Sequence, residues 1–368
     1  MSDELDNVDH HRVHMPCLDG LRGLAALIVV LGHAPEYGLN SIIIIESRNF
    51  GVLIFFVLSG FLMGYLYLDK EADQNSIFDY IFSRISRIVP LYYSVLIASY
   101  SYYHIDKDFV YRFSITQFVR CITFNGSESV FWSIGPEFQF YFLFILLWII
   151  YRYLDKKLLF VIFLLLVSLF SLITIKYWSG IIVFSKFHVF ACGVILSIVK
   201  LRALRDLSPI TIRYAQLIGL MLLFLTLFYE NIFYLFGYFS PGPSDNRLVY
   251  FYSSLPHLLL AGYLVFIFSY YDVVGKIFLG NSFAVMLGNF SFSIYLLHDA
   301  IFYFLNSMGL LTFLGPNIGL LISILLIIIF SSLTYSFIEV PSRKNLKTML
   351  MDRYRLITNN MSPSRSDL

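Results

Sequence analysis

Arg22 and His33 interrupt an otherwise apolar stretch near the N-terminus, with ten residues between them. At about 100° per residue, their eleven steps make about three turns plus 20°, so both side chains share one helix face about 16 Å apart along the axis. A guanidinium stays charged and can hold an anion, whereas an imidazole can accept a proton near neutral pH. The alternative is that Arg22 reaches lipid headgroups and His33 hydrogen-bonds a neighbouring helix or lies in the outer interface.

The composition indicates which elements position these residues. Of the 368 residues, 58% are hydrophobic and 14% are charged, whereas about 25% are charged in a soluble domain. The chain is therefore an integral membrane protein, and its net charge of +2 argues against a nucleic-acid binder. Its three cysteines, Cys17, Cys121 and Cys192, are widely spaced and predict neither a disulfide framework nor a metal site.

Ten apolar stretches approach the roughly 20 residues that a helix needs to cross a bilayer. Their approximate cores are residues 21–36, 50–68, 88–103, 136–151, 158–175, 184–199, 214–235, 255–271, 283–305 and 317–338. The patterns at 88–103 and 184–199 are the weakest. The expected fold is an all-α polytopic membrane bundle of about ten transmembrane helices, with longer outer loops at 104–131 and 236–254.

The basic residues predict the orientation of this bundle. With the N-terminus inside, 19 of the 26 Lys and Arg residues fall on the inner side, and an excess of positive charge is typical of cytoplasmic loops. Both termini are therefore expected in the cytoplasm. The expected organisation is a cytoplasmic segment at 1–17, a transmembrane domain at 18–341 and a basic cytoplasmic tail at 342–368.

Six ordered blocks between residues 18 and 341 resemble the pattern of one known family. They are the Arg22/His33 pair, GVLIFFVLSGFL at 51–62, RISRIVPLY at 84–92, WSIGPE at 132–137 followed by Phe140 and Tyr141, SIYLLH at 293–298, and IEVP at 338–341. In type, spacing and order they resemble the membrane-bound acyltransferase-3 family. Each block alone is short, but together they cover nearly the whole chain.

The resemblance implies an O-acyltransferase of the bacterial inner membrane. It would move an acyl group, most often acetyl from cytoplasmic acetyl-CoA, to a hydroxyl of a cell-surface or lipid-linked carbohydrate on the far side. Acetyl-CoA is then a donor substrate, and no permanently bound cofactor is expected. The expected partners are acyl-CoA, a carbohydrate or glycolipid acceptor and membrane lipids, with no nucleic acid and with self-association left open.

The resemblance and the chemistry of the side chains together assign the roles. The expected catalytic residues are His33 as general base, with Glu137 and Arg22. Arginine binds phosphate oxygens with a planar fork, so Arg22, Arg84 and Arg87 are expected to bind the donor. Ser59 is also an expected donor-binding residue, as a hydroxyl near the thioester. The expected acceptor-binding residues are Trp132, Ser133, Tyr295 and His298. His188, His257 and Asp299 receive no role, and Glu339 is expected to pair with basic residues of the tail.

Several of these residues also have purely structural interpretations. Arg84 and Arg87 fit the ordinary excess of basic residues on the inner side, and Glu137 fits the preference for acids at a helix N-terminus. Ser59, followed by Gly60, fits close helix packing. The intramembrane Arg, His and Glu residues also suit a transporter or flippase, although the internal symmetry typical of such proteins is missing from the sequence.

The chain departs from the family pattern at two points. Relatives often carry Arg before the F-x-x-x-G of the sixth helix, where this chain has Lys186. Lysine keeps the charge but loses the planar fork, so a bidentate contact is not expected there. Some relatives also carry a fused SGNH-type hydrolase domain, which this sequence does not contain.

Overall fold

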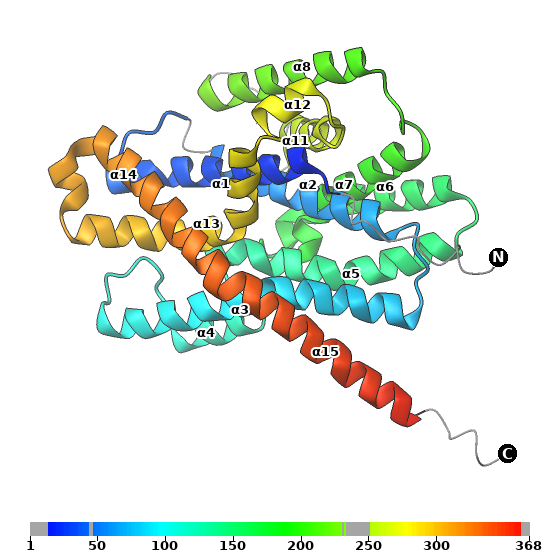
Figure 1. The fold of residues 1–368 in the computed structure, drawn as a ribbon, viewed down its shortest axis with the longest axis horizontal. Coiled ribbons are helices and arrows are strands. Elements are labelled where there is room, and N and C mark those ends of the chain that lie inside the picture. The colour runs from blue at the N-terminus through cyan, green and yellow to red at the C-terminus, as the bar shows by residue number, and fades with distance from the viewer. Residues whose placement is uncertain (1–13, 44–46, 230–231, 233–250, 362–368) are drawn as a thin grey trace, which may run out of the picture.

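The computed structural model describes residues 14–43, 47–229, 232 and 251–361, and these residues contain helices and no strand. The helices run mostly side by side, as Figure 1 shows, with α8, α11 and α12 along one edge of the bundle and α3 and α4 along the opposite edge. The prediction of an all-α polytopic helix bundle is confirmed.

Eight helical segments of the described residues are long and apolar enough to cross a membrane. They contain α1 (Pro16–His33) with η1 (Ala34–Tyr37), α2 (Arg48–Tyr67), α3 (Gln74–Ile105), η3 (Ser129–Ser133) with α5 (Ile134–Tyr153), α6 (Lys157–Thr174) with η4 (Ile175–Tyr177), α8 (Pro209–Phe228), α13 (Ser282–Ser307), and α14 (Leu310–Thr334) with the helices that follow it. The remaining helices are shorter: α4 (Ile115–Ile122), η5 (Val183–Ser185), α7 (Phe187–Arg202), α11 (Leu255–Phe268) and α12 (Val273–Phe278).

Two of the ten predicted spans are thus short helices. The 16 residues of α7 and the 14 of α11 reach about 24 Å and 21 Å at 1.5 Å per residue, less than a hydrocarbon core of about 30 Å. The predicted span at 88–103 is only the apolar part of α3, whose N-terminal turns are polar. The end of the predicted span at 214–235 and most of the predicted loop at 236–254 lie outside the described residues.

The end of the chain is helical as far as the structure describes it. Gly315 has φ +73°, which breaks α14 just before Pro316, and the predicted span at 317–338 begins directly after this break. A π-helical turn, η6 (Tyr335–Glu339), joins α14 to α15 (Val340–Met361). The basic segment after Pro341 is therefore helical as far as Met361. In Figure 1, α14 and α15 form one long run that crosses α3 and leaves the bundle.

Glycines allow the central helices to approach closely. A Cβ atom at Gly23 in α1 would lie 2.7 Å from the backbone nitrogen of Gly288 in α13, and one at Gly288 would lie 2.0 Å from the carbonyl oxygen of Asp19. Between α2 and α7, a Cβ atom at Gly60 would lie 2.0 Å from the carbonyl oxygen of Phe190. Small residues at helix crossings permit this kind of packing in membranes, and here they fix α1 directly against α13.

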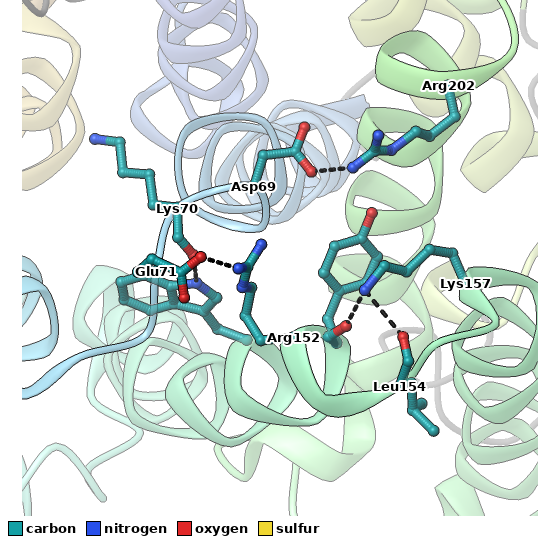
Figure 2. A network of polar contacts seen from close by, with 9 residues as sticks. Asp69, Lys70, Glu71, Arg152, Leu154, Lys157 and Arg202 are labelled. Atoms are coloured by element: carbon teal, nitrogen blue, oxygen red, sulfur yellow. Dashed lines mark hydrogen bonds and ion pairs between the residues drawn. The ribbon is translucent and has the colours of Figure 1, made fainter.

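Ion pairs join the ends of α2, α5 and α7, which we call the inner end after the predicted orientation. Figure 2 shows Arg202 paired with Asp69 and Arg152 paired with Glu71, both acids lying in the turn after α2. Lys157 Nζ donates to the carbonyl oxygens of Tyr151 (2.5 Å) and Leu154 (3.0 Å) at the end of α5. These basic side chains therefore hold helix ends together.

Candidate active site

A cavity of about 600 Å³ lies between α1, α2, α3, α5 and α13. Six of the predicted site residues line it: Arg22, Ser59, Arg87, Ser133, Glu137 and Tyr295. Val52, Phe55, Phe56, Ile88, Ile134 and Phe292 supply an apolar wall, and Tyr141 and Ser291 complete the lining. The structure thus brings together residues that are up to 273 positions apart in the sequence.

Two guanidinium groups give the cavity a cationic side. Arg22 comes from α1 and Arg87 from α3, and the charges are close enough to repel each other. Asp19, one turn before Arg22, offsets part of this charge, with its Oδ1 3.4 Å from Arg22 Nη1. The Arg22 side chain is 15% exposed. Two partly covered arginines beside an open space can bind an anionic ligand with forked hydrogen bonds.

The carboxylate of Glu137 is held in place at the cavity wall. Its Oε1 accepts hydrogen bonds from Ser59 Oγ at 2.5 Å and from Tyr141 Oη at 2.6 Å. Glu137 lies in the first turn of α5, where a negative charge is also favoured by the helix dipole. Tyr141 follows Glu137 by four residues, one helical turn later, and this spacing was the signal that could have identified it as part of the site.

Beyond the cavity, toward the other end of α13, two histidines are in contact. His33 Nδ1 lies 3.3 Å from His298 Nε2, and the ring centroids are 4.9 Å apart. His33 Nδ1 is also 2.8 Å from the carbonyl oxygen of Val29, and His298 Nδ1 is 2.8 Å from that of Tyr295. Because a carbonyl oxygen only accepts, each neutral ring carries its proton on Nδ1. His33 Nε2 is then left unprotonated and can act as a base.

The Tyr295 side chain lies between the cavity and this histidine pair. Ser133 Oγ and Tyr295 Oη are 2.8 Å apart at the cavity wall, and the Tyr295 ring lies 6.1 Å from that of His298. The polar column, as we call Arg22, Glu137, Tyr295, His298 and His33, therefore crosses much of the bundle. Its order from Arg22 to His33 follows the shared face that the sequence predicts for α1.

A family model described as an acyltransferase domain, of the acyltransferase-3 type, matches residues 15–336. The chain belongs to this family. It is a multi-pass membrane acyltransferase, and the resemblance read from its six sequence blocks is confirmed. No curated protein and no solved structure gives a significant match to the chain.

The acyltransferase holds Arg84 apart from the other two predicted donor-binding arginines. The guanidinium carbon of Arg84 lies 5.8–5.9 Å from the ring centroids of Tyr67, Tyr80 and Tyr141, and Nη2 donates to Tyr67 Oη at 3.3 Å. Arg84 lines a separate space of about 190 Å³. Three residues along a helix turn the side chain by about 60° relative to Arg87, and the tyrosines stabilise the cation by cation–π contact.

Trp132 and Lys186 of the acyltransferase also lie away from the cavity lining. The Trp132 ring packs 6.3 Å from Phe56 and 5.7 Å from Tyr252, measured between centroids. Lys186 is 2% exposed, and its ammonium lies 4.3 Å from the Tyr252 ring centroid. The Tyr252 ring therefore contacts both side chains, and its contact with Lys186 is a cation–π contact.

Asp299 is a site residue that the sequence reasoning left without a role. Its side chain is buried next to His298, where Oδ1 accepts from Tyr37 Oη at 2.6 Å and Oδ2 accepts from Ser129 Oγ at 2.9 Å. These bonds tie η1, which follows His33 directly, and η3 to α13. The signal was an acid inside an apolar helix, which usually marks a functional position.

Among the described residues, no group of three or more His, Cys, Asp or Glu side chains could hold a metal ion. The cavity offers guanidinium, hydroxyl and carboxylate groups instead. Such groups can bind an anion, orient a hydroxyl and move a proton.

Proposed function

We propose that this acyltransferase moves an acetyl group from acetyl-CoA to a hydroxyl of a cell-surface or lipid-linked carbohydrate, with His33 as general base. The observation that carries the proposal is the polar column, which runs from two arginines at the cavity to the paired histidines. Membership of an acyltransferase family favours this function over transport. We further propose the bacterial inner membrane as its location, with the donor in the cytoplasm.

The cationic side of the cavity suits the phosphates of coenzyme A. Arg22 and Arg87 would bind phosphate oxygens, and the uncharged pantetheine arm would extend past Ser59 and Glu137 along the apolar wall. The thioester at the end of this arm would then lie near Tyr295. Arg84, which is enclosed by tyrosines, would act through Tyr141 by positioning Glu137.

The chemical step needs one base and no change of oxidation state. The acceptor oxygen attacks the thioester carbonyl carbon while His33 Nε2 takes the hydroxyl proton. The carbon–sulfur bond then breaks, and the imidazolium returns the proton to the departing thiolate, so that an ester and free coenzyme A are formed. His298 and the Val29 carbonyl oxygen hold the His33 ring through its Nδ1 side.

The closed packing between the cavity and His33 sets a geometric requirement. His33 does not line the cavity, so the acetyl group would have to pass Tyr295 and His298 to reach it. The acceptor would approach from the opposite side, where His33 is partly exposed. Ser133, Tyr295 and His298 would then contact the acceptor hydroxyl, whereas Trp132 would support them from behind.

The proposal is tested by following labelled acetyl groups. Purified protein in liposomes would receive acetyl-labelled acetyl-CoA and a bacterial envelope carbohydrate extract as acceptor. We expect label in the carbohydrate fraction that mild alkali releases, as an ester requires. Stable incorporation into amide, or acetyl-CoA consumption equal to that of protein-free liposomes, would contradict an O-acetyltransferase.

A further inference from the structure

The donor in the proposed function is larger than the cavity that would receive it. The space of about 600 Å³ includes the opening of the cavity to solvent, so its side chains do not enclose a ligand as long as acetyl-CoA. Acetyl-CoA joins its acyl-pantetheine arm to a nucleotide that carries a diphosphate and a separate 3′-phosphate. Arg22 and Arg87 line the cavity and can pair with the diphosphate next to the arm. The adenosine and its 3′-phosphate would then lie outside, on the inner surface.

The π-helical turn η6 leads from the cavity to that surface. Its last residue, Glu339, is 5% exposed and accepts a hydrogen bond from Ser293 Oγ at 3.3 Å. The Glu339 carboxylate lies within electrostatic range of Arg87, Arg343 and Arg22. Single π-helical turns occur often at functional sites. The buried carboxylate thus lies in the electrostatic field of both cavity arginines and of Arg343 at the beginning of α15.

The first turn of α15 carries two further basic residues at the surface, outside the bundle. Arg343 follows Glu339 by four residues, about one helical turn, and Lys344 comes next. Both side chains are exposed. The other end of the helix carries a second exposed pair, Arg353 and Arg355, about 15 Å further along the axis at 1.5 Å per residue.

Side-chain contacts fix α15 against α3, the helix that carries Arg87. Lys347 Nζ pairs with Asp79 Oδ1 at 2.6 Å, and Tyr354 Oη donates to Asn75 Oδ1 at 3.0 Å. The Tyr354 ring also lies 4.5 Å from the Phe78 ring, between centroids. Figure 1 shows α15 crossing α3 as it leaves the bundle. These contacts hold the middle and later turns of α15 beside the first turns of α3, which lie on the predicted cytoplasmic side.

Three other basic residues of the inner end bind acids or carbonyl groups at the helix ends. Arg152 and Arg202 pair with the acids after α2, and Lys157 binds carbonyl oxygens at the end of α5, as Figure 2 shows. The start of α15 carries two neighbouring exposed cations, and one of them, Arg343, lies within electrostatic range of the Glu339 carboxylate, as the two cavity arginines do.

We propose that Arg343 and Lys344 bind the 3′-phosphate of the donor nucleotide, outside the cavity. This inference rests on the proposed acetyl-CoA donor. Arg22 and Arg87 hold the diphosphate, the pantetheine arm enters between them, and the first turn of α15 receives the far end of the nucleotide. The charge of the 3′-phosphate complements that of the two side chains.

The test compares coenzyme A with 3′-dephospho-coenzyme A, which lacks only this phosphate. The full chain would be placed in nanodiscs of neutral lipid, and each compound would compete with labelled acetyl-CoA for binding. We expect wild type to bind coenzyme A about tenfold more tightly than the dephospho form, as two partly exposed charge pairs allow. The double variant Arg343→Gln/Lys344→Gln should lose this difference and bind the dephospho form as wild type does.

A matched variant separates a specific site from general charge. Arg353→Gln/Arg355→Gln removes the same charge from the far end of α15 and should leave both affinities unchanged. Lys344→Gln alone should reduce the affinity difference between the two competitors only in part, and it leaves Arg343, the residue near Glu339, unchanged. Equal losses of coenzyme A affinity in the two double variants would overturn the site and indicate diffuse or lipid-mediated attraction. A wild type that binds coenzyme A and the dephospho form equally would also overturn it. If labelled acetyl-CoA does not bind wild type at all, the proposed donor fails, and this site with it.

Discussion

The inner and outer halves of the polar column differ in what the charged groups in and beside them contact. In the inner half, Arg22 and Arg87 border a cavity of about 600 Å³. In the outer half, Asp299 accepts two hydrogen bonds of 2.6 and 2.9 Å, and the two histidine rings pack against each other. The inner half is suited to receiving a ligand, whereas the outer half holds one imidazole in a fixed orientation. Substitutions in the two halves should therefore have different consequences.

The largest effect is expected from His33→Ala. Removing a general base lowers the rate by about 10²–10⁴-fold, so acetyl transfer should fall by this factor. Donor binding should stay unchanged, because His33 lies outside the cavity. Both are measured with labelled acetyl-CoA, by transfer at saturating donor and by equilibrium binding. If His33→Ala kept full transfer, the outer half would have no catalytic role.

A smaller effect, on donor binding and not on the rate of transfer, is expected from Arg22→Gln and Arg87→Gln. Each should weaken donor binding by about tenfold to a hundredfold, because hydrogen bonds to charged groups contribute about 1.5–3 kcal/mol. Arg22→Lys should lose less, since it keeps the charge but not the fork. Arg152→Gln is the control: it removes an inner-end arginine that pairs with Glu71 and should leave affinity unchanged. Equal losses in the control would mean that the cavity arginines contribute only general positive charge.

Glu137 lies where the inner and outer halves of the polar column meet, and Glu137→Gln tests to which half it belongs. The variant keeps an oxygen that can accept from Ser59 and Tyr141 but loses the charge that strengthens both bonds. We expect transfer at saturating donor to fall about tenfold, as loss of roughly 1–2 kcal/mol implies, with little change in donor affinity. A drop in affinity without a drop in rate would place Glu137 with the donor-binding groups instead.

The smallest effect on activity is expected from Tyr37→Phe. It removes the Tyr37 hydroxyl, which donates to the carboxylate and to the backbone carbonyl of the buried Asp299, and this should lower stability by about 1–3 kcal/mol. Activity should change only a few-fold, because His33 is still held by Val29 and His298. Thermal unfolding in detergent and the transfer assay measure the two quantities. A loss of activity as large as that of His33→Ala would show that Asp299 and Tyr37 act in the chemical step.

The sequence predicted the elements of the site better than its contacts. Local spacing placed Arg22 and His33 on α1, and local apolar runs located the helices. The contact between His33 and His298 depends on how closely α1 approaches α13 through Gly23 and Gly288, a tertiary property that spacing along one helix does not contain. Sequence composition alone indicates that the chain lies in a membrane, but not which helices meet.

The arginines of α3 illustrate the same limit. Arg84 and Arg87 share one motif and one expected role, yet the helix turns them apart and only Arg87 lines the main cavity. The tyrosines that enclose Arg84 come from α2, α3 and α5, so no local pattern marks the enclosure. The sequence predicted a basic tail after Pro341 without a conformation for it, and the structure has the helix α15 there.

The central claim is that donor and acceptor enter the polar column from opposite sides of the membrane. Sealed vesicles of known orientation test it directly when labelled acetyl-CoA is added to the outside only. We predict that inside-out vesicles, which expose the face carrying α15, consume the donor and acetylate carbohydrate, while right-side-out vesicles do so only after permeabilisation. Consumption by sealed right-side-out vesicles alone would contradict the claim.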